Sequence, residues 1–159
     1  MLKQRKNIRL RYFDYNSAGA YFVTFCTHNQ DNILASFVGA IHESPEMILT
    51  DYGIIVDNII KNLQYQNVSI PYYAVMPNHV HLVIIVNDNV VKNTRSIVSN
   101  VIGFIKMNAS KQAHKIDENI NVWQRGFYDH VIRDENDYIS IVEYIQNNPL
   151  KWVLDKYYK

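Results

Sequence analysis

The chain has 159 residues, 48% of them hydrophobic, a net charge of +1 and one cysteine, Cys26. This length suits a single domain spanning residues 1–159 with a sizeable core. The near-neutral charge gives no sign of nucleic-acid binding, and no apolar run is long enough to span a bilayer. A lone cysteine excludes an internal disulfide and, with a charged and polar N-terminus, predicts a cytoplasmic protein with no membrane partner.

The N-terminal part combines a basic arm with the first predicted strand. Residues 1–19 form the arm, whose cations are Lys3, Arg5, Lys6, Arg9 and Arg11. Residues 20–27 are aromatic and β-branched, which predicts a strand. Residues 37–48 predict a hairpin or a shorter strand pair. Thr50 can then cap a helix over residues 51–62.

Two histidines separated by one residue lie within an apolar segment. Residues 72–86 predict the central strand, with a turn at Pro77 that puts His79 near the start of its Val/Ile-rich part. Residues two apart on a strand point to the same face, so we expect His79 and His81 side by side on its exposed face. Two neutral imidazoles can supply two ligands of a metal site. The alternative is that they are ordinary histidines of a half-buried sheet.

The C-terminal half predicts two helices and a hairpin. Residues 92–108 have apolar side chains at helical spacing. Residues 122–133 predict a hairpin with its bend at Gly126. Residues 134–148 predict a helix that begins with an acidic cap and is stopped by Pro149. Together these elements predict an α+β fold, with a sheet and helices packed on one of its faces.

The last predicted helix has a tyrosine and an amide on one side. Its apolar stripe is centred near Tyr138 and Ile145, and Tyr144 lies about 100° from that centre. Asn148, four residues later, lies on the same side, so its amide oxygen could complete a site with two histidines. The alternative is a boundary aromatic and an ordinary C-terminal helix residue.

These motifs together resemble the REP-associated tyrosine transposases, a branch of the single-tyrosine HUH transposases. The matching segments run nearly end to end, and the ordered series is more specific than any one of them. They are Tyr15 with Gly19-Ala20-Tyr21-Phe22-Val23-Thr24, Val75-Met76-Pro77-Asn78-His79-Val80-His81, Trp123-Gln124-Arg125, Tyr128-Asp129-His130-Val131-Ile132-Arg133-Asp134 and Tyr144-Ile145-Gln146-Asn147-Asn148-Pro149.

The resemblance implies a ferredoxin-like (RRM-like) antiparallel sheet and a site on four residues. The metal-binding histidines of the family fall on His79 and His81, and its nucleophile falls on Tyr144. Related transposases place a metal-binding glutamine where this chain has Asn148, which is one methylene shorter. The expected cofactor is Mg²⁺ or Mn²⁺, and by ligand softness this donor set suits Mn²⁺ better.

The implied activity is nicking and rejoining of single-stranded DNA through a 5′-phosphotyrosine intermediate. The expected partner is single-stranded DNA with a hairpin, bound by a monomer or a homodimer. Base-stacking candidates are Trp123, Tyr128 and Tyr73, with core packing as the alternative. The candidate phosphate contacts are Arg5, Lys6, Arg9, Arg11, Arg125 and Arg133.

Three other functions are compatible with parts of this pattern. An RRM-type binding module would share the fold, but the chain lacks the basic-glycine-aromatic run of such modules. A two-histidine phosphoesterase needs paired HxS or HxT motifs, and only His42-Glu43-Ser44 fits. A non-mobile host factor derived from a transposase would have the same chemistry and the same sequence pattern.

Overall fold

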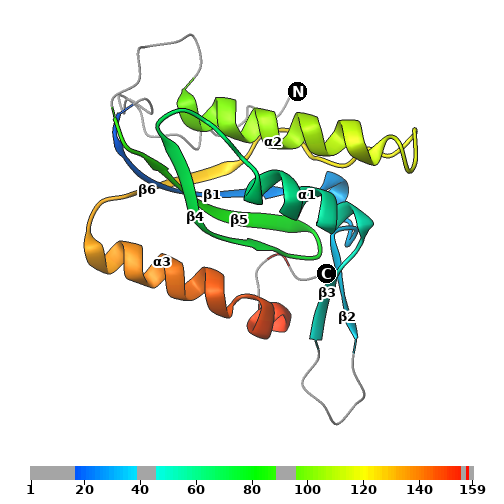
Figure 1. Ribbon diagram of the computed structural model, residues 1–159. Coiled ribbons are helices and arrows are strands. Elements are labelled where there is room, and N and C mark those ends of the chain that lie inside the picture. Colours follow the sequence, from blue (N-terminus) through cyan, green and yellow to red (C-terminus); the bar gives the residue numbers. More distant parts are fainter. Residues whose placement is uncertain (1–16, 39–45, 89–95, 155–156, 158–159) are drawn as a thin grey trace, which may run out of the picture.

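The computed structural model describes residues 17–38, 46–88, 96–154 and 157, and within them it contains a four-stranded sheet, a separate strand pair and three α-helices (Figure 1). The strands of the large sheet are β1 (Gly19–Cys26), β4 (Val68–Val75), β5 (His79–Val86) and β6 (Tyr128–Ile132). The strand pair is β2 (Ala35–Val38) and β3 (Glu46–Leu49), and the α-helices are α1 (Asp51–Lys61), α2 (Ile97–Ala113) and α3 (Glu135–Asn147).

The large sheet has the order β4-β5-β1-β6, and each neighbouring pair is antiparallel. With α1 between β1 and β4, and α2 between β5 and β6, the element order is that of a ferredoxin-like fold. The predicted α+β class and antiparallel sheet are therefore confirmed. The β2–β3 pair inserted before α1 also agrees with the predicted hairpin or strand pair.

The helices cover both faces of the sheet, so the prediction that they pack on one face is wrong. α1 and α2 pack on the face that carries Tyr21, Val23 and Phe25 of β1. α3 and the 3₁₀ helix η2 (Pro149–Leu154) lie on the opposite face, where Ile145 and Trp152 pack with Phe22 of β1 (Figure 1). Six of the eight residues of β5 are apolar, which suits a strand that is covered on both faces.

Three predicted elements differ in their extent. The expected strand over 72–86 is a hairpin of β4 and β5, because the chain turns at Met76–Asn78 and the Met76 amide donates to the His79 carbonyl. The expected hairpin over 122–133 is a single strand, β6, preceded by one bridge between Thr27 and Trp123. The helix expected over 92–108 begins later, at α2, after a cap in which the Ser96 hydroxyl accepts from the Ser99 amide.

Among the described residues, no helix is both long and apolar enough to cross a membrane. The structure does not describe residues 1–16. Four of the expected phosphate contacts therefore lie outside the described residues: Arg5, Lys6, Arg9 and Arg11.

Candidate active site

His79 and His81 occupy the first and third positions of β5 and point to the same face, as the strand period predicts. Their Nε2 atoms lie 2.9 Å apart. Two neighbouring ligands at about 2.1 Å from an octahedral cation would lie about 3.0 Å apart. The pair therefore has the spacing of two ligands of one ion.

The outer nitrogen of each ring is held by a neighbouring side chain. The Nδ1 atom of His79 lies 2.8 Å from the Asn78 Oδ1 atom, and the Asn78 Nδ2 group donates to the carbonyls of Gln30 and Tyr157. That network orients the amide oxygen toward the ring, so we assign the His79 proton to Nδ1 and leave its Nε2 lone pair facing His81. The Nδ1 atom of His81 lies 2.7 Å from the Thr24 Oγ1 atom. Such partners fix the orientation of metal-binding histidines.

Tyr144 reaches this pair from α3. Its Oη atom lies 3.2 Å from the His81 Nε2 atom. Its ring packs edge-on against Phe22, with centroids 6.1 Å apart, and 40% of the residue is exposed. The helical phase predicted that Tyr144 lies at the edge of the buried stripe. The structure agrees, since the neighbouring Ile145 is buried and Tyr144 is not.

Asn148 is the C-cap residue of α3 and is only 3% exposed. Among the described residues, neither its amide nitrogen nor its amide oxygen has a hydrogen-bond partner. An unpaired buried amide costs about 1–3 kcal/mol unless something outside the chain satisfies it. Asn148 is therefore more deeply buried than its predicted position at the edge of the helix implied. Its amide oxygen is free to accept a bond from a bound group.

The two histidines are fully buried, so the expectation of an exposed strand face is wrong. The cause is a cover from the C-terminal part of the chain. The Tyr157 ring lies 4.5 Å from the His79 ring and 6.1 Å from the His81 ring, and the Trp152 ring lies 5.7 Å from His79, all between centroids. The Tyr157 carbonyl also accepts the Asn78 hydrogen bond, which ties this cover to the turn before β5.

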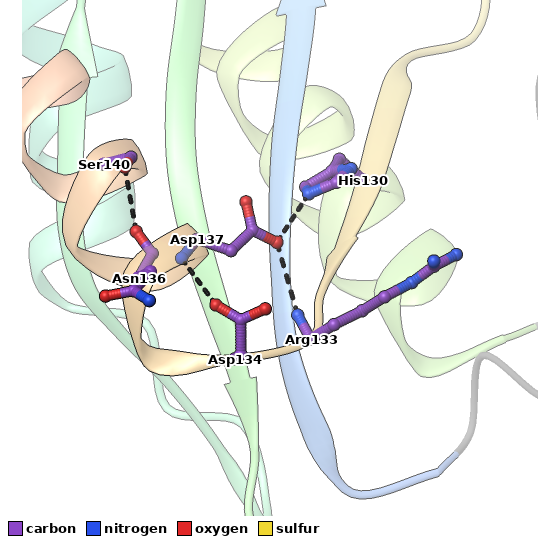
Figure 2. Close-up of polar contacts among 6 residues, drawn as sticks. All are labelled: His130, Arg133, Asp134, Asn136, Asp137 and Ser140. Atoms are coloured by element: carbon purple, nitrogen blue, oxygen red, sulfur yellow. Dashed lines mark hydrogen bonds and ion pairs between the residues drawn. The ribbon is translucent and has the colours of Figure 1, made fainter.

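The N-terminal end of α3 is fixed to β6 by a small polar network (Figure 2). The Asp134 carboxylate caps the helix by accepting from the Asp137 amide. The Asp137 carboxylate lies 2.8 Å from the His130 Nε2 atom and accepts from the Arg133 amide. The predicted acidic cap is confirmed. His130 of β6 is therefore paired with the helix that carries Tyr144.

The hydrogen bond from His130 is the main cause of a lowered pKa for Asp137. A carboxyl whose pKa is lower in the folded state stabilises the fold above its unfolded pKa, and this contribution is lost as the pH falls through the folded value. We expect Asp137→Asn to reduce the free energy of unfolding by about 0.3–1 kcal/mol at pH 7, because water screens this partly exposed pair. The difference from wild type should shrink as the pH falls through the lowered pKa of Asp137 in the folded state.

Urea unfolding at pH 7 and at acid pH measures this effect. Glu135→Gln is the matched control, because it removes a charge from the same first turn of α3 without touching His130. An equal loss for both variants would assign the effect to the helix dipole instead of the pair.

Arg125 and Arg133, the other expected phosphate contacts, are both exposed and lie at opposite ends of β6. Thr24, Asn78, Phe22 and Tyr157 contact the site but were not assigned to it from the sequence. Asn78 adjoins His79 and could have been found from its place in the motif. Thr24, Phe22 and Tyr157 are far away in sequence, so only the strand register and the packing identify them.

The sequence model of the family described as "Transposase IS200 like" matches residues 21–148. The chain therefore belongs to the IS200-like transposase family, and within it resembles the REP-associated tyrosine transposases. A protein of Haemophilus influenzae named as a REP-associated tyrosine transposase is 23% identical over 149 residues, covering 87% of this chain and 74% of that protein. An uncharacterized protein of Haemophilus influenzae is 31% identical over 175 residues, covering 99% of this chain and 94% of its own length.

Solved structures agree with the fold. A REP-associated tyrosine transposase bound to a REP hairpin superimposes with a TM-score of 0.60 at 21% identity, covering 93% of this chain and 74% of that one. A structure described as a transposase from Deinococcus radiodurans superimposes with a TM-score of 0.50 at 14% identity, covering 87% of this chain and 95% of that one.

Proposed function

We propose that this transposase-family protein nicks and rejoins single-stranded DNA, with Tyr144 as the nucleophile and a divalent cation as the cofactor. The observation that carries the proposal is the convergence of the Tyr144 Oη atom on a buried pair of histidine Nε2 atoms, 3.2 Å from the nearer one. A partly exposed phenol beside potential metal ligands is the arrangement that attack on a phosphodiester requires.

The residues present fit a cation of the Mg²⁺ or Mn²⁺ type. His79 and His81 would hold it through Nε2, and the unpartnered Asn148 amide is the candidate third ligand. Among the described residues no three His, Cys, Asp or Glu side chains form a metal cluster, and we infer the third ligand from the buried Asn148 amide, whose oxygen has no hydrogen-bond partner there. A bound cation would polarise the scissile phosphate and neutralise the negative charge that develops on it.

The remaining steps involve the Tyr144 hydroxyl, the DNA backbone and solvent. If the His81 Nε2 atom held the cation, that nitrogen would no longer be available to the Tyr144 hydroxyl, and the phenol oxygen would stand beside the phosphate that the cation polarises. The Tyr144 proton passes to solvent, the bond from Oη to phosphorus forms and the bond from phosphorus to the 3′ oxygen breaks, with that oxygen taking up a proton. The phosphotyrosine retains the free energy needed for rejoining, so the reaction requires no ATP.

Two features bear on the partner and on the rival function. Tyr144 lies against His81 of its own chain, which supports cleavage by one chain without the helix of a second copy.

An RRM-type module binds nucleic acid on the sheet face opposite its two helices. Here α3 and η2 pack on that face, which disfavours simple sheet-surface binding (Figure 1).

The test is incubation of the protein with labelled hairpin DNA carrying a single-stranded flank, with Mn²⁺, followed by denaturing electrophoresis. We expect a covalent protein–DNA adduct that needs the metal and the single-stranded flank. Failure to form an adduct, or equal cleavage of a fully paired duplex of the same sequence, would refute the proposal.

Tyr157 covers the histidine pair, so its removal should ease access to the site. An aromatic contact contributes about 0.5–1.5 kcal/mol, so Tyr157→Ala should lower the Mn²⁺ concentration for half-maximal cleavage by about two- to tenfold. A Mn²⁺ titration of adduct formation measures this shift. Leu150→Ala in η2 is the control, because Leu150 is an exposed residue of the same C-terminal region. An unchanged or higher Mn²⁺ requirement for Tyr157→Ala would contradict the role of Tyr157 as a cover.

A further inference from the structure

A row of three side chains crosses the sheet at the level of the site. His81 of β5 is paired with Thr24 of β1, and Thr24 is paired on its other side with Tyr128 of β6. Directly paired residues of antiparallel strands point to the same face. The Thr24 hydroxyl bonds His81 on the α3 face, so the Tyr128 side chain lies on that face too.

Tyr128 belongs to the open part of this face. β6 is an edge strand, and α3 packs against β4 and β5 and not along the whole of β6. The other end of β6, at Ile132, leads into α3, and Figure 1 shows this connection at the edge of the sheet. Tyr128 is 37% exposed, close to the value for Tyr144. Neighbouring strands lie about 4.8 Å apart, so the Cα atoms of Tyr128 and His81 are about 10 Å apart.

The turn that leads into Tyr128 is held in place by Lys106 and contains the exposed Arg125. The Lys106 ammonium donates to the carbonyls of Gln124 and Gly126, at 2.9 and 2.6 Å, on either side of the exposed Arg125. Gly126 has a φ of +86°, which suits glycine. The Gln124 amide donates to the Cys26 carbonyl, and Cys26 is paired with His79, so this turn lies at the histidine end of the sheet.

Burial lowers the pKa of Lys106 to about 8. Both the charged and the neutral amine have enough hydrogens to donate these two bonds. The turn therefore keeps its geometry across neutral and mildly alkaline pH.

We propose that Tyr128 is a stacking platform for a base of the single-stranded DNA next to the phosphate attacked by Tyr144, with Arg125 contacting a phosphate of the same flank. This inference rests on the proposed function and names how the same site holds its substrate. Core packing does not account for Tyr128, because the residue is exposed and lies outside both core clusters of the described chain. An exposed phenol on an open face, three residues after the exposed Arg125, combines the two kinds of side chain that single-stranded DNA recognition uses.

The experiment measures binding of hairpin DNA with a single-stranded flank by fluorescence anisotropy, with 2-aminopurine in the flank as a stacking probe. We expect Tyr128→Ala to weaken binding by about five- to 100-fold and to remove the 2-aminopurine quenching, since base stacking on an aromatic contributes that much. Tyr128→Phe keeps the ring and should bind within about twofold of wild type. Arg125→Ala should lower the slope of log affinity against log salt by about 1.

Phe104→Ala is the matched control, because Phe104 is an aromatic of similar exposure, 42%, on α2 across the sheet. It should leave binding unchanged. Wild-type affinity for Tyr128→Ala, or an equal loss for Tyr128→Phe, would overturn the inference. Adduct formation by wild type with no effect of Tyr128→Ala would refute only the stacking role. Loss of stacking in Tyr128→Ala without any wild-type adduct would refute only the catalytic proposal.

Discussion

Tyr144→Phe is expected to abolish the covalent adduct and to reduce DNA cleavage by at least about 10³-fold, because it removes the oxygen atom that we propose as the nucleophile. The fold should be little affected. Tyr144 is partly exposed, and the substitution keeps its ring while it removes the hydrogen bond between Oη and the His81 Nε2 atom. We expect a change of about 1 kcal/mol or less in the free energy of unfolding. DNA binding should remain within a few-fold of wild type.

Tyr138→Phe is the control on the same helix. Tyr138 packs in the core beneath α3, edge-on to Tyr72, and burial raises its pKa, which keeps the phenol neutral. This variant should form the adduct at close to the wild-type rate. Denaturing electrophoresis with labelled DNA compares the two variants. If Tyr144→Phe formed the adduct and Tyr138→Phe did not, the assignment of the nucleophile would be wrong.

His79→Ala or His81→Ala should also abolish cleavage, and binding of Mn²⁺ measured by calorimetry should be lost with it. Both histidines are fully buried, so each substitution also leaves a cavity and an unpaired neighbour, Asn78 or Thr24. We expect a loss of about 2–4 kcal/mol in folding stability, contrary to the expectation of an exposed pair. The Mn²⁺ measurement must therefore be made on protein shown to be folded by circular dichroism.

Two milder substitutions separate metal binding from stability. Thr24→Val keeps the shape but removes the hydrogen bond that orients His81, and should weaken Mn²⁺ binding by about 10- to 100-fold. Asn148→Ala removes two buried polar atoms that have no partner among the described residues, so stability should not fall as far as in the histidine variants. Cleavage by Asn148→Ala should recover at high Mn²⁺. Normal Mn²⁺ binding by a folded His79→Ala, His81→Ala double variant would rule out this site.

Local sequence patterns determined the elements that carry the site. The β-branched run after Pro77 placed His79 and His81 on one face of β5, because side chains alternate along any strand. The apolar spacing of α3 placed Tyr144 beside its buried stripe, because the helical angle per residue is fixed. The acidic cap at Asp134 gave the start of that helix. Each of these features depends on residues within a few positions of one another.

Only the tertiary structure decided how these elements meet. The sequence did not reveal that α3 covers the face opposite α1 and α2, because an apolar stripe shows that a helix is buried and not which face of the sheet buries it. It also could not place Thr24 beside His81, or Tyr157 over His79, since these contacts join residues 57 and 78 positions apart through strand register and chain path. Periodicity is a local property, whereas register and layer order are set by packing between distant segments.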